Sequence, residues 1–85
     1  MSNIVYTRHA QEKFALLARY GFAVKPEQVE DTILNPEQVI SQADGKFIAQ
    51  KGVTAQHVLR VVYVKEGQTF LVITFYPGRK DRYEN

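Results

Sequence analysis

The spacing of hydrophobic residues changes about halfway along the chain. Between residues 7 and 34, apolar positions recur every three or four residues in two stretches. From residue 38 to residue 76 they form short runs rich in β-branched side chains. The first spacing is typical of helices and the second of strands. With a short β-branched run at 3–6, the pattern predicts a strand, two helices and about four further strands.

Local signals predict where the two helices begin and end. Thr7 is a suitable N-cap for the first helix, and Gly21 can adopt the positive φ of a residue that follows a helix. Pro26 suits the start of the second helix, which ends before Pro36 because the residue preceding a proline disfavours the α region. The buried face of the first helix is predicted to consist of Ala10, Phe14, Leu17 and Ala18.

Turn residues divide the second half of the chain into strands. Gly45 and Gly67 mark two turns, and the Pro77-Gly78 pair is expected to end the last strand. The predicted strands are 38–41, 46–51, 57–65 and 68–76. The fold class is therefore α+β, in the order β-α-α-β-β-β with one more strand. The two helices are expected to pack on one face of an antiparallel sheet.

Composition narrows the classes of protein and site. With 85 residues, 45% of them hydrophobic, the chain is long enough for one small domain with a single core. The absence of cysteine excludes disulfides and thiolate metal sites, and two distant histidines predict no metal or cofactor. No apolar run approaches the roughly 20 residues of a membrane span, and the N-terminus lacks a signal-peptide pattern. A cytoplasmic protein without a membrane partner is expected.

Charge is distributed unevenly between the two halves. Residues 1–45 carry four Lys or Arg against six Asp or Glu, a net charge of −2, whereas residues 46–85 carry seven against three, a net charge of +4. A basic C-terminal half indicates an anionic partner, and ordinary surface charge is the alternative.

Three segments resemble a family of small bacterial domains that is grouped with the RelE/ParE toxin superfamily and is similar to BrnT-type toxins. The segments are YTRHAQEKFALLARYG at 6–21, VEDTILNPEQVI at 29–40 and HVLRVVYVKEGQTFLVITFYP at 57–77. The resemblance covers nearly the whole chain and implies a RelE/ParE-like architecture in one domain. It also implies the toxin half of a toxin–antitoxin pair, with an antitoxin protein as partner and RNA or the ribosome as target. The family's usual arginine after the His-Ala pair is Lys13 here, which keeps the charge but loses bidentate phosphate geometry.

RelE-like enzymes cleave RNA without a metal ion, so side chains must supply every catalytic group. The reaction needs a group that takes a proton from the ribose 2′-hydroxyl, cations that stabilise the phosphorane, and an acid for the 5′-oxygen. His9, Arg60 and Tyr76 are the candidate catalytic residues. The candidates for binding RNA phosphates or stacking on bases are Lys13, Arg79, Lys80, Arg82 and Tyr83.

Structural roles are alternatives for each of these residues. His9 is also explained by packing against the N-terminal strand with a backbone group as its partner. Arg60 lies between apolar neighbours, so it must pair with a carboxylate such as Glu12 or Glu30, extend its stem to the sheet margin, or bind an anion. Tyr76 also suits the edge of the core, on the face of the strand that carries Phe70 and Val72. The basic tail is alternatively a frayed terminus.

Three functions remain open at this point. The first is a metal-independent endoribonuclease toxin in which the candidate residues line one cleft. The second is a non-catalytic module of ParE-like type that acts on a protein target through the same fold. The third is a domain without toxicity that is stable alone as a monomer or as a dimer through its last strand. RNA cleavage, a tight protein complex, or neither would distinguish them.

Overall fold

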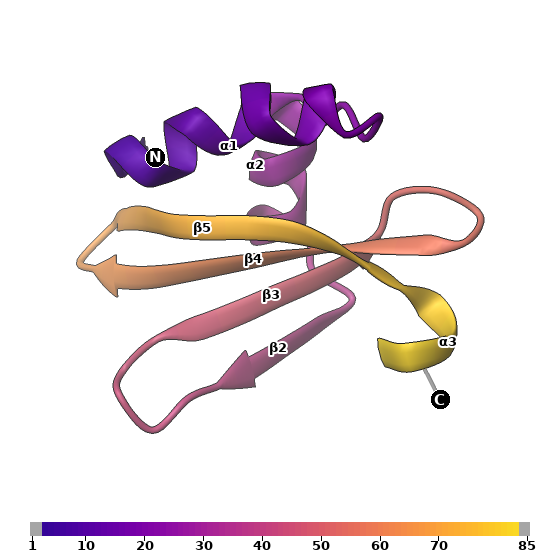
Figure 1. The fold of residues 1–85 in the computed structure, drawn as a ribbon. Helices are drawn as coiled ribbons and strands as arrows, with labels where there is room; N and C mark the ends of the chain where they lie inside the picture. Colours follow the sequence, from indigo (N-terminus) through magenta and orange to yellow (C-terminus); the bar gives the residue numbers. More distant parts are fainter. Residues whose placement is uncertain (1–2, 84–85) are drawn as a thin grey trace.

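The computed structural model describes residues 3–83, which contain one five-stranded sheet and three helices (Figure 1). In chain order the elements are β1 (Asn3–Tyr6), α1 (Arg8–Arg19), α2 (Pro26–Leu34), β2 (Gln38–Ser41), β3 (Phe47–Gly52), β4 (His57–Glu66), β5 (Thr69–Arg79) and α3 (Lys80–Tyr83). The predicted α+β class, the first two helices and all five strands are confirmed, whereas α3 was not predicted. None of the helices among residues 3–83 is long and apolar enough to cross a membrane.

The sheet is mixed rather than antiparallel, which corrects the expectation from the sequence. Its strand order is β1-β5-β4-β3-β2, and the pairs from β2 to β5 are antiparallel. β1 pairs with β5 in the parallel sense. Short turns force successive strands to run antiparallel, but β1 is joined to the other strands through two helices, so its direction is not set locally.

The predicted helix caps are confirmed and anchor α1 to the sheet. The Thr7 hydroxyl oxygen accepts a hydrogen bond from the backbone N of Ala10 at 3.1 Å, and the hydroxyl donates to the carbonyl oxygen of Ile73 on β5 at 3.0 Å. Gly21 follows the helix with a φ of 82°. At the start of α2, the backbone N of Lys25 donates to the side chain of Gln28 at 2.8 Å. The start of α1 is therefore tied to the middle of β5.

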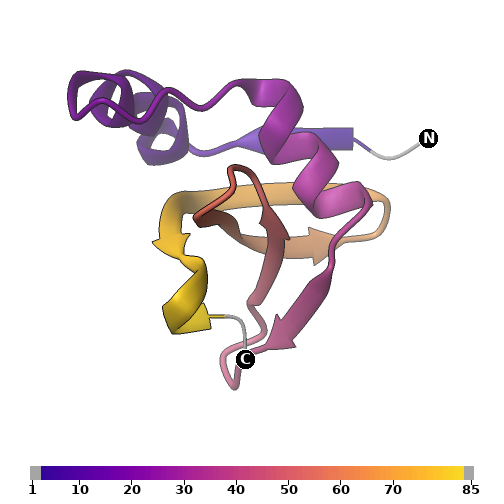
Figure 2. The same cartoon turned by 90° about the vertical axis from the view of Figure 1, so that its right-hand side faces the viewer.

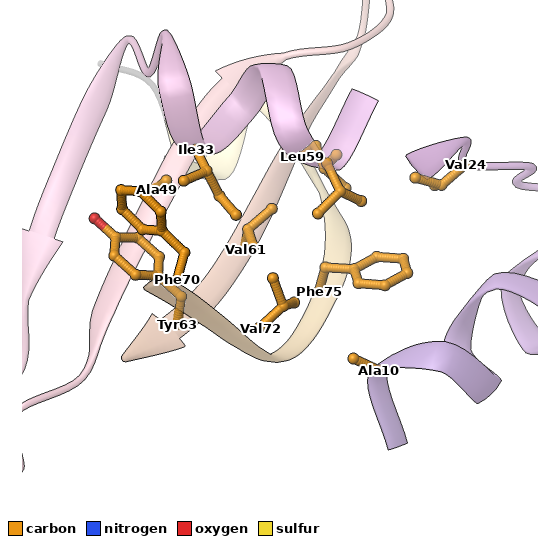
Figure 3. Packing of buried hydrophobic residues seen from close by; sticks show 11 residues of the cluster. Ala10, Val24, Ile33, Ala49, Leu59, Val61, Tyr63, Phe70, Val72 and Phe75 are labelled. Atoms are coloured by element: carbon orange, nitrogen blue, oxygen red, sulfur yellow. The ribbon is translucent and has the colours of Figure 1, made fainter. Parts of the chain in front are cut away.

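The core lies between α1 and α2 and the sheet face that they cover (Figures 1 and 3). Its fully buried large side chains include Val29, Leu59, Val61, Val72 and Phe75. Each stabilises the fold by about 1.5–3 kcal/mol through its removal from water. Ala18, expected on the buried face of α1, is exposed. Successive helical residues lie about 100° apart, so Ala18 falls outside the stripe that contacts the sheet.

β5 contains a β-bulge that changes which face its second half presents. One residue, Ile73, has no partner on β4. The pairs on either side of it are Val62–Thr74 and Tyr63–Val72. Because side chains alternate along a strand, one extra residue reverses the faces of all later positions. The expectation that Tyr76 shares a face with Phe70 and Val72 is therefore wrong: Tyr76 lies on the face opposite α1 and α2, called here the helix-free face because neither of these two helices covers it.

β5 also continues beyond its predicted end, through Pro77 and Gly78 to Arg79. β1 accompanies β5 only as far as Val72, so Pro77 lies where β5 has no strand on its outer side. Proline lacks the N–H that a second neighbour would need, and such an edge position tolerates it. The chain then turns into α3, which lies on the side of the sheet away from α1 and α2 (Figure 2). The tail is therefore folded onto the sheet as far as Tyr83.

Candidate functional site

Arg60 lies in the middle of the helix-free face and is only 8% exposed. Leu59 and Val61 on either side of it belong to the core, so alternation turns Arg60 to the opposite face. Its register partners are Gln50 on β3 and Tyr76 on β5. Three polar side chains from adjacent strands therefore form one row across the sheet.

The guanidinium of Arg60 is held by two neutral oxygen atoms. Nη1 donates to Oε1 of Gln50, and Nε donates to the hydroxyl oxygen of Tyr76 at 3.2 Å. A guanidinium has five N–H donors, so these two bonds use fewer than half of them. Gln50 itself is only 2% exposed, so the row is buried at its β3 end as well as at Arg60 in its centre.

Of the alternatives open for Arg60, a pair with Glu12 or Glu30 is not formed. Glu12 forms an ion pair with Arg8 on α1 at 3.5 Å, and Glu30 accepts a hydrogen bond from the Tyr6 hydroxyl at 3.0 Å. Both carboxylates belong to helices on the other side of the sheet. None of the four ion pairs among residues 3–83 includes Arg60.

Tyr83 covers Arg60 from the C-terminal helix. The carbon Cζ of Arg60 lies 4.1 Å from the centre of the Tyr83 ring and 5.8 Å from the centre of the Tyr76 ring. The Gln50 side chain donates from Nε2 to the backbone carbonyl of Tyr83 at 3.3 Å. A cation stacked on an aromatic ring is stabilised by about 0.5–2 kcal/mol. The contacts join α3 to the polar row.

Gly78 makes this approach of Tyr83 sterically feasible. A Cβ atom at position 78 would lie 2.3 Å from Cε2 and 2.5 Å from Cδ2 of the Tyr83 ring. Any other residue would displace the ring, so a glycine is required by close approach rather than by backbone conformation. Gln50 does not stand out in the sequence, and Gly78 is noted there only as a turn residue, because the contacts of both arise from the register of β3, β4 and β5.

The predicted basic tail lies at the end of the sheet where β4 begins and β5 ends. The Arg79 guanidinium is exposed and pairs with Asp81 at 2.8 Å. A hollow of about 470 Å³ is lined by Ala55, Gln56, His57, Arg79, Lys80 and Asp81. Arg82 is exposed and lines a smaller hollow, of about 260 Å³, with Arg79 and Asp81. The tail therefore places two exposed arginines at one end of the sheet.

Lys80 is less exposed than its neighbours Arg79 and Arg82 in the tail. A Cβ atom at Gly52 would lie 3.2 Å from Nζ of Lys80, so the ammonium group is packed against the end of β3. The backbone N of Lys80 donates to the carbonyl oxygen of Gln56 at 2.9 Å. We infer that Lys80 contributes less to binding of an anion than the two arginines.

His9 reaches the edge of β5 near the row. Its Nε2 is hydrogen-bonded to the Thr74 hydroxyl at 3.1 Å, so its partner is a side chain of β5 rather than a backbone group of β1. Thr74 precedes Tyr76 by two residues on the same face, about 6.6–6.8 Å along the strand. The His9 side chain is exposed. His9 is thus beside the helix-free face although it belongs to α1.

The structure separates Lys13 from the Arg60 row. It lines a shallow hollow of about 400 Å³ whose walls all belong to α1. The residues around it are His9, Glu12, Ala15, Leu16 and Arg19. The row on β3, β4 and β5 therefore lies on one side of the sheet and Lys13 on the other, with His9 between them at the edge.

Among the described residues no group of three or more His, Cys, Asp or Glu is arranged to hold a metal ion. Nor do comparisons with known proteins assign the chain to a family, since no family model, curated protein or solved structure matches it. Function must therefore be inferred from the geometry of the Arg60 row.

Proposed function

We propose that this chain is an RNA-binding protein of the RelE/BrnT toxin type that cleaves RNA without a metal ion. The observation that carries the proposal is the buried Arg60 guanidinium, whose hydrogen-bond partners within residues 3–83 are both neutral. A buried cation without a counter-charge is costly, and an anionic ligand would offset that cost. The planar fork of arginine matches the oxygen atoms of a phosphate.

The proposed reaction transfers two protons. His9 takes the proton of a ribose 2′-hydroxyl, the 2′-oxygen bonds to the adjacent phosphorus, and the bond from phosphorus to the 5′-oxygen breaks. Tyr76 gives its hydroxyl proton to the 5′-oxygen, while Arg60 stabilises the extra negative charge of the phosphorane. The products are a 2′,3′-cyclic phosphate and a 5′-hydroxyl.

The hydrogen bonds of the free protein are compatible with these roles. Arg60 donates to the Tyr76 oxygen, which leaves the Tyr76 proton available for donation. Thr74 is bonded to Nε2 of His9. If Nε2 carries the proton of the neutral ring and donates it to Thr74, Nδ1 keeps a lone pair and acts as the base.

Arg79 and Arg82 would bind the backbone phosphates on either side of the cleaved bond. Their exposure and their position at the end of the sheet suit contacts that carry no base specificity. Such contacts release counterions from RNA, so affinity should fall steeply as salt rises.

The test is cleavage of a single-stranded RNA by the full chain in the presence of EDTA. Wild-type protein should produce 2′,3′-cyclic phosphate ends, and His9→Ala, Tyr76→Phe and Arg60→Lys should lose most of this activity. Lys46→Gln is the matched control, because Lys46 lies in the β2–β3 turn and pairs only with Asp44 there. Circular dichroism and thermal melting would verify the fold of every variant. Cleavage that persists in Arg60→Lys and His9→Ala would refute the assigned roles.

A non-catalytic module that binds a protein is the second candidate, and one feature favours it. The helix-free face carries an apolar strip beside the polar row, and Val5 at its edge is 47% exposed. The other members of the strip are Ile40, Val62, Val64 and Leu71, which are half-buried, and Ile48, which is 5% exposed. An antitoxin or a target protein could cover this strip. Absence of cleavage by wild-type protein, together with a stoichiometric protein complex that Val5→Asp weakens, would select this function.

A further inference from the structure

We propose that α3 is a latch that closes over Arg60 and must swing away before an anion reaches the guanidinium. This inference rests on the proposed anion-binding role of Arg60. It adds regulation of that site by four residues of the same chain, Lys80–Tyr83, called here the latch. Figure 2 shows the latch folded back beneath the sheet, against the ends of β4 and β5.

The latch blocks the guanidinium by stacking. The Tyr83 ring lies 4.1 Å from Cζ of Arg60, and Arg60 keeps only 8% of its surface exposed. A phosphate bound by the remaining N–H groups of the guanidinium would need solvent access to its edge. With Tyr83 in place, that access is nearly closed.

The latch is held by few contacts. It has four residues, and none of their side chains is buried. Its attachments are the Tyr83 stack, the bond from Gln50 to the Tyr83 carbonyl at 3.3 Å, the bond from the Lys80 backbone N to Gln56 at 2.9 Å, and the exposed ion pair between Arg79 and Asp81 at 2.8 Å. A segment with so little buried apolar surface opens at a lower free-energy cost than the whole domain. Opening therefore does not require unfolding of the sheet.

Gly78 leaves the space on β5 that the Tyr83 ring occupies when the latch is closed. A Cβ at this position would overlap the Tyr83 ring at 2.3 Å, and removal of that conflict requires the ring to leave. Gly78 is not among the glycines with positive φ, so alanine fits its backbone without strain. Gly78→Ala is thus a substitution that opens the latch and leaves β5 intact.

The latch predicts a specific pattern of affinities. If it is closed about nine-tenths of the time, apparent affinity for an anion is reduced about tenfold. Gly78→Ala and Tyr83→Ala should then bind a short fluorescent single-stranded RNA up to about tenfold more tightly than wild type. Tyr20→Ala is the matched control, because it removes the same ring from a side chain that is 80% exposed at the end of α1. The double variant Gly78→Ala/Arg60→Gln should lose the gain.

Two readouts separate failure of the latch from failure of the proposed function. Anisotropy of the labelled RNA with full-length variants reports binding, and NMR exchange of the Arg60 Nε–H with water reports opening without any ligand. Faster exchange and tighter binding in Gly78→Ala support the latch. Equal or weaker binding by Gly78→Ala and Tyr83→Ala, while Arg60→Gln still reduces the affinity of wild type, overturns the latch but not the anion site. Equal binding by wild type and Arg60→Gln overturns the anion site, and the latch with it.

Discussion

Gln50 on β3 contacts both the cation and the segment that covers it: its Oε1 accepts from Nη1 of Arg60, and its Nε2 donates to the backbone carbonyl of Tyr83. Gln50 is 2% exposed, so both ends of its amide are used in a place that water scarcely reaches. One side chain therefore orients the guanidinium and helps to hold α3 over it. The helix-free face is organised around this pair of bonds.

Replacement of Gln50 by leucine should weaken both the fold and the site. Leucine keeps the volume but leaves the Arg60 guanidinium without one of its two acceptors, at a cost of about 1–3 kcal/mol in the free energy of unfolding. Chemical denaturation measures this loss. Gln38→Leu is the control. Gln38 is the register partner of Gln50 on the neighbouring edge strand β2, and its side chain is exposed. Equal stability of the two variants would argue against a role for Gln50 in holding Arg60.

Replacement of Thr74 by valine should lower the rate of the proposed RNA cleavage more than the stability of the fold. The hydroxyl is hydrogen-bonded to His9 Nε2 at 3.1 Å and so orients the imidazole ring. Its loss frees the tautomer and the orientation of the ring, so the rate of cleavage should fall. Thr74→Ser keeps the hydroxyl and should retain the wild-type rate, as a single-turnover cleavage assay would record. An unchanged rate in Thr74→Val would contradict a positioning role for the Thr74 hydroxyl.

Replacement of Thr7 by alanine should destabilise α1 and its attachment to β5. Thr7 caps the helix by accepting from Ala10 and donates to the Ile73 carbonyl at the bulge. Loss of an N-cap costs about 0.5–2 kcal/mol in the free energy of unfolding. Thr7→Ser keeps the hydroxyl and should lose much less, as a thermal melt would record. Similar melting temperatures for Thr7→Ala and wild type would contradict this account.

The Tyr6 phenol should make the fold sensitive to alkali. Burial and its hydrogen bond to Glu30 raise the pKa of Tyr6 above the ordinary value of 10.0. The folded chain therefore keeps this proton where the unfolded chain has lost it, so stability is complete below about pH 10 and falls as pH rises further. Burial also raises the pKa of Tyr63, in the same direction.

Urea denaturation of wild type and Tyr6→Phe between about pH 8 and about pH 11 measures this effect. Tyr6→Phe should lose less stability than wild type over that range, because phenylalanine has no proton to release. Tyr63 still titrates in the variant, so a smaller decline should remain. Parallel curves for the two proteins would show that the Tyr6–Glu30 pair does not govern the alkaline limb.

Much of the fold was readable from local patterns. The boundaries of β1 and β2, the caps of α1 and the turn at Gly45 depend on residues close together in the sequence, and the structure confirms them. The parallel pairing of β1 was missed because no local signal sets the direction of two strands joined through helices. The bulge at Ile73 was missed as well, since an unpaired residue is defined only by the strand opposite it.

The candidate site was likewise predicted only in part from the sequence. Arg60 stood out in the sequence because a charged residue between apolar residues of a strand is unusual. The structure shows that this residue is buried on the helix-free face. Its partners could not be read from the chain, because Gln50 and Tyr76 meet it only through strand register. By itself the sequence determined the α+β class, the helix ends and the unusual arginine, all of which depend on local backbone preferences and on the spacing of hydrophobic residues. The tertiary structure alone decided the face of Tyr76, the separation of Lys13 and the closure of Tyr83 over Arg60, because each depends on contacts between segments that are distant along the chain.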